Sequence, residues 1–116
     1  MTRVLALGLI GTIAASIGVV PARAADGIVL AGSGLFLPNR LDLEQGSTLT
    51  LVNVDAAEHN ITSTRTGRDG EPRFSSDTLG PGEIGTVDGV SKLKPGAYAF
   101  FCTLHEYQRG LLLIAG

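Results

Sequence analysis

The sequence has very few of the side chains that most metal clusters and disulfide-rich folds require. Among its 116 residues there is one cysteine, there are two histidines, and there is no tryptophan. A single cysteine excludes an intramolecular disulfide and any zinc or iron–sulfur site built on several cysteines of one chain. Two histidines are too few for a site that needs three imidazoles. The only methionine is Met1, so the rest of the chain has no thioether.

The chain also lacks an excess of basic residues. Nine Lys and Arg residues face eleven Asp and Glu residues, which gives a net charge of −2. Proteins that bind nucleic acids normally carry a basic surplus, so no nucleic-acid partner is expected. The hydrophobic fraction of 44% and the charged fraction of 17% are typical of a globular domain rather than a disordered segment.

Residues 1–24 have the pattern of a secretory signal peptide. Arg3 supplies a positive start, residues 4–20 carry no charge, and Ala22 and Ala24 are small residues at the positions that a signal peptidase reads. We expect cleavage after Ala24, which leaves one domain over residues 25–116 that is exported to the periplasm or secreted and has no membrane association. The alternative is an uncleaved anchor, because the apolar run is near the lower length limit for a spanning helix.

The remaining chain shows no long helical periodicity. Sixteen glycines and five prolines separate short apolar runs, several of which alternate with polar residues and are rich in β-branched side chains. This pattern predicts about eight short strands and an all-β fold, either a two-sheet sandwich or a Greek-key barrel. Residues 63–73 are polar and predict a surface loop. The clearest strands are expected at residues 28–31, 41–44, 48–54, 84–87, 97–102 and 111–114.

Two places hold the side chains that bind soft metals, and each follows the end of an expected strand. His59 comes after the strand ending at Val54, and Cys102 ends another strand, with His105 three residues later in an expected loop that runs to Gln108. A Cys-x-x-His turn brings a thiolate and an imidazole close enough to share one metal. One thiolate with two imidazoles is the trigonal ligand set of a blue-copper site, although zinc binds the same donors. The alternatives are a small buried Cys102 and two ordinary histidines.

With these motifs the mature chain resembles the small cupredoxins of the plastocyanin and amicyanin type. The resemblance implies a Greek-key β-sandwich that binds one type 1 copper per chain. It also implies that His59, Cys102 and His105 are the equatorial ligands, and that the backbone around Asn60 hydrogen-bonds toward the thiolate. The residues that carry it are Leu51 to Asp55, His59-Asn60, Phe74 to Ser76, Leu79, Pro95 to Cys102, His105 and Gly110.

The family usually has a methionine as a weak axial ligand after the second histidine, and this chain has none there. In the short family spacing the position is Gln108, and in the longer spacing it is Gly110, which has no side chain. Glutamine is a known axial alternative, so we expect the side-chain carbonyl of Gln108 to be the axial donor. The other possibilities are a solvent-facing Gln108 with a three-coordinate or water-bound site, and a backbone carbonyl from Glu58.

The function that follows from the resemblance is a mobile carrier of single electrons that cycles between Cu(II) and Cu(I). A copper carrier or buffer that hands the ion on is the alternative. An enzyme is not expected, because copper oxidases and nitrite reductases need further histidines. We expect a monomer that docks transiently with redox partner proteins through the surface near Leu104, His105 and Tyr107, unless Leu104 and Tyr107 serve only loop packing.

Overall fold

The computed structural model describes residues 26–116, so the predicted signal peptide over residues 1–24 lies outside the described part. Within the described residues the chain forms eight strands, one short 3₁₀ helix over Val90–Lys92 and no α-helix. The all-β prediction is therefore confirmed. No helix in this part of the chain has the length and apolar character needed to cross a membrane.

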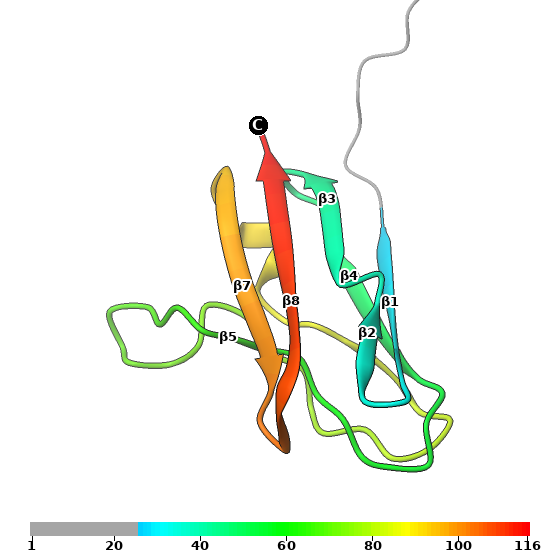
Figure 1. The fold of residues 1–116 in the computed structure, drawn as a ribbon. Helices are drawn as coiled ribbons and strands as arrows, with labels where there is room; N and C mark the ends of the chain where they lie inside the picture. The colour runs from blue at the N-terminus through cyan, green and yellow to red at the C-terminus, as the bar shows by residue number, and fades with distance from the viewer. Residues whose placement is uncertain (1–25) are drawn as a thin grey trace, which may run out of the picture.

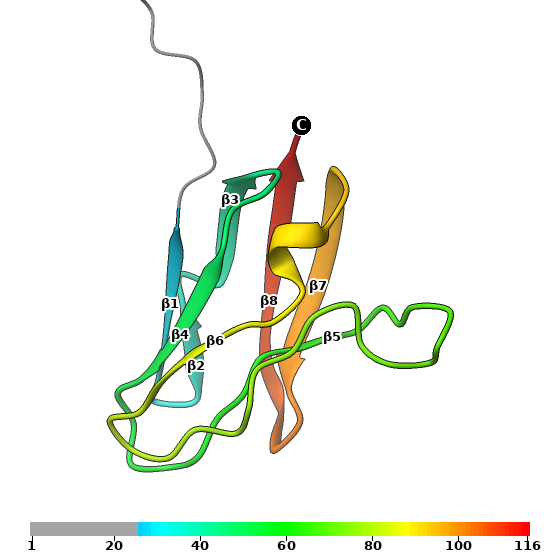
Figure 2. The same ribbon diagram turned by 180° about the vertical axis from the view of Figure 1, so that it is seen from behind.

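The strands form two four-stranded sheets that pack face to face as a sandwich (Figures 1 and 2). The first sheet pairs β1 with β4 in parallel, and its other pairs are antiparallel. Strand β1 thus lies beside β4 although two other strands separate them in the sequence. In spatial order, the first sheet consists of β2 (Leu35–Leu37), β1 (Gly27–Gly32), β4 (Leu49–Asn53) and β6 (Ile84–Thr86).

The second sheet is also mixed, because β3 runs parallel to β8 while β8, β7 and β5 are antiparallel neighbours. The chain passes between the sheets after each of β2, β3, β4, β5 and β6, so neighbours within each sheet come from distant parts of the sequence. This crossing gives the Greek-key sandwich and not a closed barrel. In spatial order, the second sheet consists of β3 (Arg40–Glu44), β8 (His105–Ala115), β7 (Gly96–Cys102) and β5 (Thr62–Ser63).

The core lies between the sheets and follows from the alternation along each strand. In β7, Tyr98, Phe100 and Cys102 share the buried face, as the alternating pattern predicts. Phe36 of β2 packs on Phe100 with ring centroids 5.2 Å apart, which joins the two sheets directly below the metal-binding end. Burying each such side chain stabilises the fold by about 1.5–3 kcal/mol, so the core keeps both sheets in register.

Gly110 has a structural role in this core. It pairs with Phe100 across β7 and β8, and a Cβ atom at Gly110 would overlap the Phe100 ring. Only glycine leaves room for that ring. The longer family spacing, which places the axial position at Gly110, therefore falls on a residue whose missing side chain is needed for packing.

The sequence-based loop from Cys102 to Gln108 is wrong. Strand β8 begins at His105, and only Thr103 and Leu104 form the turn between β7 and β8. The prediction failed because residues 105–109 are polar, whereas His105 and Arg109 pair with Cys102 and Phe101 of β7 on either side of a register shift. His105 and Gln108 therefore stand on a strand, which holds them more firmly than a loop would.

Candidate metal centre

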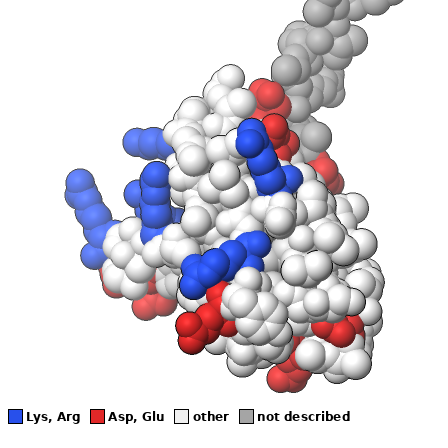
Figure 3. Space-filling view, viewed as in Figure 1, with Lys and Arg blue, Asp and Glu red and all other residues white. Residues whose placement is uncertain are grey.

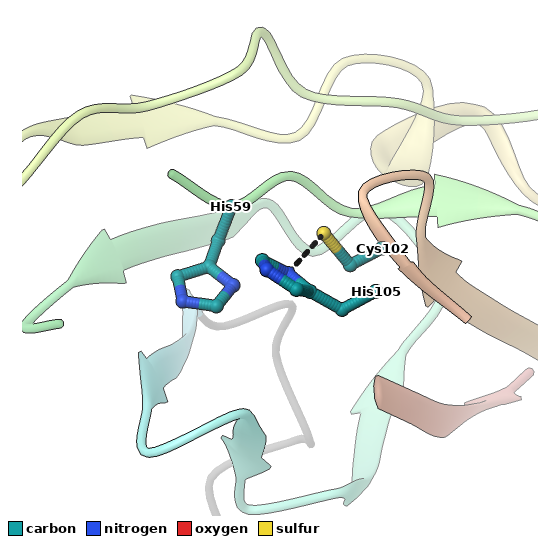
Figure 4. A group of neighbouring side chains, drawn as sticks. All are labelled: His59, Cys102 and His105. Atoms are coloured by element: carbon teal, nitrogen blue, oxygen red, sulfur yellow. Dashed lines mark hydrogen bonds between the residues drawn. The ribbon is translucent and has the colours of Figure 1, made fainter. Parts of the chain in front are cut away.

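Three of the predicted site residues meet at one end of the sandwich. One potential ligand atom from each of His59, Cys102 and His105 lies within 4.8 Å of the others (Figure 4). Cys102 is fully buried and His59 is 1% exposed, whereas His105 is half-buried. The three side chains come from the segment after β4, the end of β7 and the start of β8, so the fold brings together residues 43 positions apart in the sequence.

The turn between β7 and β8 positions Cys102 and His105 locally. Because only two residues separate them, they face each other as the last pair of the β7–β8 ladder. The Sγ atom of Cys102 lies 3.6 Å from Nδ1 of His105. The sulfur of Cys102 and an imidazole nitrogen of His105 thus lie side by side, as the Cys-x-x-His spacing predicts.

His59 is placed by longer-range hydrogen bonds. Its backbone N–H donates to the carbonyl of Leu79 at 3.1 Å, and the Leu79 N–H donates to the His59 carbonyl at 2.8 Å. The fully buried Asn53 organises the segment that leads to it. The Asn53 amide donates to the carbonyls of Ala57 at 2.8 Å and Leu79 at 2.9 Å, and its Oδ1 accepts from the Asp55 N–H at 2.9 Å. The histidine therefore sits on a rigid segment.

Both ring nitrogens of His59 face oxygen atoms. Nδ1 lies 2.7 Å from Oε1 of Gln108, and Nε2 lies 2.8 Å from Oδ2 of Asp55. Figure 4 shows one ring nitrogen of His59 turned toward His105 and Cys102 and the other turned away. The two acceptors thus hold the ring from opposite sides.

Gln108 is fully buried, so the alternative in which it faces solvent is ruled out. Its Nε2 donates to the Leu35 carbonyl at 2.9 Å. Because only the NH₂ group can donate to a carbonyl, this bond fixes the orientation of the Gln108 amide and places Oε1 on the side of His59. The axial donor proposed from the sequence therefore has its oxygen directed at a predicted ligand.

Asp55 is the acid at this end of the molecule that contacts a predicted ligand. The hydrogen bond from His59 lowers the pKa of the Asp55 carboxyl most, and backbone N–H groups of Ala56 and Gly34 lower it further. The Ala56 N–H donates to Asp55 Oδ1 at 2.8 Å. Asp55 is therefore an ionised acceptor at neutral pH.

Asn60 joins the two segments of the site through its side chain. Its Nδ2 donates to Oγ1 of Thr103 at 2.8 Å and of Thr78 at 3.1 Å, while its Oδ1 accepts from the Thr103 N–H at 3.2 Å. The resemblance implied a backbone hydrogen bond near Asn60 to the sulfur. Among the hydrogen bonds of residues 26–116, the one recorded at Sγ of Cys102 involves His105 instead.

Two exposed side chains that are largely apolar, Leu104 and Tyr107, flank the half-buried His105. Leu104 is 51% exposed and Tyr107 is 72% exposed, and the Tyr107 ring lies 5.9 Å from the His105 ring. In Figure 3, basic side chains lie over the upper and middle parts of the visible face, whereas its lower end carries acidic and uncharged side chains. The β7–β8 turn lies at that lower end in the same view (Figure 1).

Sequence reasoning did not identify Asp55 as a site residue, nor the structural roles of Asn53 and Leu35. The only available signal was that Asp55 precedes His59 by four positions. In a helix that spacing indicates a contact, but in a loop it predicts nothing without the backbone path. The Leu35 contact involves a backbone carbonyl, which no side-chain pattern reveals.

Comparison with known proteins agrees with this geometry. A family model described as a cupredoxin-like domain matches residues 4–114. No curated protein sequence matches the chain.

Solved structures with the same fold include copper proteins. A novel purple cupredoxin from Nitrosopumilus maritimus is 24% identical, with a TM-score of 0.60, over 77% of this chain and 99% of that one. A methionine-to-glutamine mutant of amicyanin in its Cu(I) form is 19% identical, with a TM-score of 0.66, over 78% of this chain and 82% of that one. A tryptophan-to-tyrosine mutant of reduced amicyanin is 18% identical, with a TM-score of 0.64, over 76% of this chain and 80% of that one.

These structural likenesses establish the fold, and the family model spans nearly the whole chain. With a sandwich fold, a His–Cys–His cluster at one end and this match over residues 4–114, the chain belongs to the cupredoxin-like domain family.

Proposed function

We propose that this protein is an exported type 1 copper protein that carries single electrons between partner proteins after removal of residues 1–24. His59, Cys102 and His105 are the proposed equatorial ligands of one copper ion. The observation that carries the proposal is the convergence of one thiol and two imidazoles within 4.8 Å in a cupredoxin fold.

The donor set suits copper in both oxidation states. A thiolate favours Cu(I), imidazole suits Cu(II), and a trigonal set of one sulfur and two nitrogens is typical of electron-transfer copper. Bound copper would supply the one-electron change between Cu(II) and Cu(I). The full burial of Cys102 and the near-complete burial of His59 keep water from the sulfur and limit rearrangement of the ligands.

Gln108 is the proposed axial donor. Its buried amide and its hydrogen bond to the Leu35 carbonyl support this role, because they keep Oε1 on the side of the cluster. An amide oxygen is a harder donor than the thioether that the family usually has. It therefore favours Cu(II) and lowers the reduction potential relative to a site with an axial methionine.

His105 is the proposed route for electrons, and the surface near Leu104 and Tyr107 is the proposed docking site. The ring of His105 is half-buried, so its edge reaches the surface between exposed apolar side chains. A small apolar surface of this kind suits a short-lived complex with a redox partner, with this protein acting as a monomer.

The direct test is to add Cu(II) to purified residues 25–116 and record the visible absorption spectrum. We expect an intense thiolate-to-copper charge-transfer band that disappears in Cys102→Ser. A colourless protein, or a band that survives Cys102→Ser, would overturn the type 1 assignment. The matched control is Ser63→Ala, which alters a buried polar residue of the same sheet outside the cluster.

A competition experiment separates an electron carrier from a protein that hands copper on. The burial of Cys102 and His59 predicts that an excess of a Cu(I) chelator removes copper slowly, over hours. Rapid and complete transfer to the chelator would favour a copper buffer instead.

A further inference from the structure

The most informative group outside the proposed ligand set is the carboxylate of Asp55. We propose that Asp55 is a positioning residue, whose carboxylate holds the His59 ring so that Nδ1 rather than Nε2 is presented to Cys102 and His105. The inference rests on the proposed role of His59 as a metal ligand. Asp55 itself does not bind the metal in this arrangement.

The chemistry of the pair sets the direction of the hydrogen bond. An ionised carboxylate only accepts, so at 2.8 Å Nε2 of His59 must be the donor and must carry a proton. A protonated Nε2 has no lone pair for a metal. The nitrogen available to a metal is then Nδ1, which lies on the side of the other two predicted ligands (Figure 4).

Asp55 is itself held in place and is not a mobile surface acid. Its side chain is 24% exposed, its Oδ1 accepts from the Ala56 N–H, and its own N–H donates to Asn53. Asn53 is fully buried and bonded to the carbonyl of Leu79, which also pairs with His59. The position of the carboxylate is therefore tied to the same buried residue as the backbone of His59.

The contact of the His59 ring with Gln108 cannot orient the ring once a metal is bound. Oε1 of Gln108 only accepts, so Nδ1 of His59 is the donor in their 2.7 Å hydrogen bond. A metal at Nδ1 needs the lone pair that is left when this proton is lost, so the Nδ1–Oε1 hydrogen bond must be given up. The Asp55 bond on Nε2 is compatible with a metal at Nδ1. Outer carboxylates that accept from ligand imidazoles orient the ring and raise its basicity.

His105 provides an internal contrast. Among the hydrogen bonds of the described residues, none involves Nε2 of His105. Its place is determined by the two-residue turn that joins it to Cys102. Loss of an outer carboxylate should therefore affect His59 and leave His105 where it is.

The test compares Asp55→Ala, Asp55→Asn and the control Glu58→Ala, which removes an acid of the same loop that is exposed and lies one residue before His59. Copper affinity should fall about 10- to 100-fold in Asp55→Ala, the range typical for loss of an outer-sphere partner. Asp55→Asn should retain part of the affinity, because its amide oxygen still accepts a hydrogen bond. Glu58→Ala should change the affinity less than about threefold, since surface charges contribute little.

A second measurement needs no copper. In the metal-free protein, nitrogen NMR of the histidine rings should show an Nε2 proton of His59 protected from exchange. That protection should disappear in Asp55→Ala and persist in Glu58→Ala. Amide spectra of each variant show whether the sandwich is intact, and Asp55→Asn carries the test if Asp55→Ala does not fold.

The outcomes separate this inference from the proposed function. If Asp55→Ala and Glu58→Ala bind copper equally well, or if the His59 Nε2 proton is not protected in the unmodified chain, the positioning role is wrong. If the unmodified protein forms no charge-transfer band while the Nε2 proton is protected, the copper proposal fails and the Asp55–His59 contact stands.

Discussion

The two histidines of the site lie side by side, with ring centroids 4.8 Å apart, but they are held in opposite ways. His59 is 1% exposed, and its two ring nitrogens contact Asp55 of the same loop and Gln108 of β8. His105 is half-buried, and a two-residue turn fixes it to Cys102. The site therefore has a buried side, formed by His59 with Asp55 and Gln108, and an accessible side, formed by His105 and the β7–β8 turn. We infer that the buried His59 sets the geometry of the site and that the half-buried His105 connects it with the surface.

The largest effect is expected from substituting Asn53, which holds the segment that carries His59 on the buried side. Asn53→Ala removes three hydrogen bonds and leaves the carbonyl of Leu79 with the His59 N–H as its one remaining donor. We expect a loss of about 3 kcal/mol in the free energy of unfolding, from the cost of unsatisfied buried groups. Urea denaturation measures it. Asn39→Ala, at an exposed turn, is the control and should change the stability by less than about 0.5 kcal/mol.

Gln108→Met replaces only the proposed axial donor on the buried side, an amide oxygen, by a thioether sulfur. A thioether is softer than an amide oxygen, so the reduction potential should rise by at least about 60 mV, equivalent to a tenfold change in the balance of Cu(I) over Cu(II). Voltammetry of the copper-loaded protein measures it, with exposed Gln45→Met as the control. An unchanged or lowered potential would contradict the axial role of Gln108.

Leu104→Asp tests the accessible side. Leu104 is 51% exposed beside His105, so a charge there should leave the potential within about 20 mV but slow electron transfer from a redox partner about tenfold. Stopped-flow reduction by a partner protein measures the rate. Leu37→Asp is the matched control, because Leu37 is 50% exposed but lies in the first sheet. Equal rates for both variants would contradict the docking surface.

The smallest effect on stability is expected at Gly34, whose Cα faces the Tyr107 ring. Gly34 has a φ of +73°, and a Cβ atom there would lie 3.0 Å from Cε2 of Tyr107. Gly34→Ala should therefore destabilise the fold by about 1 kcal/mol through the left-handed backbone and should also shift Tyr107. Gly70→Ala has a similar φ of +81° with nothing within 4 Å, so it isolates the backbone cost. Tyr107 ring shifts in NMR that are equal in both variants would contradict the contact.

The sequence was most informative where function depends on local spacing. Cys102 and His105 are three residues apart, and the alternation of Tyr98, Phe100 and Cys102 correctly predicted one buried face. His59 was found as the only other histidine. The start of β8 was not found, because the polar residues 105–109 hide a strand whose pairing is made by the backbone.

The chain by itself determined the donor inventory: one thiol, two imidazoles and no thioether beyond Met1, which excluded most other metal sites. It also determined an all-β fold, since alternation and turn residues are local properties. The contact of Asp55 with Nε2 of His59 and the hydrogen bond of Gln108 to the Leu35 carbonyl became visible only in the folded chain. The physical reason is that the Asp55 contact depends on the backbone path of the loop after β4, and the Gln108 contact depends on the relative placement of the two sheets. That placement comes from the packing of the whole core, which no single motif encodes.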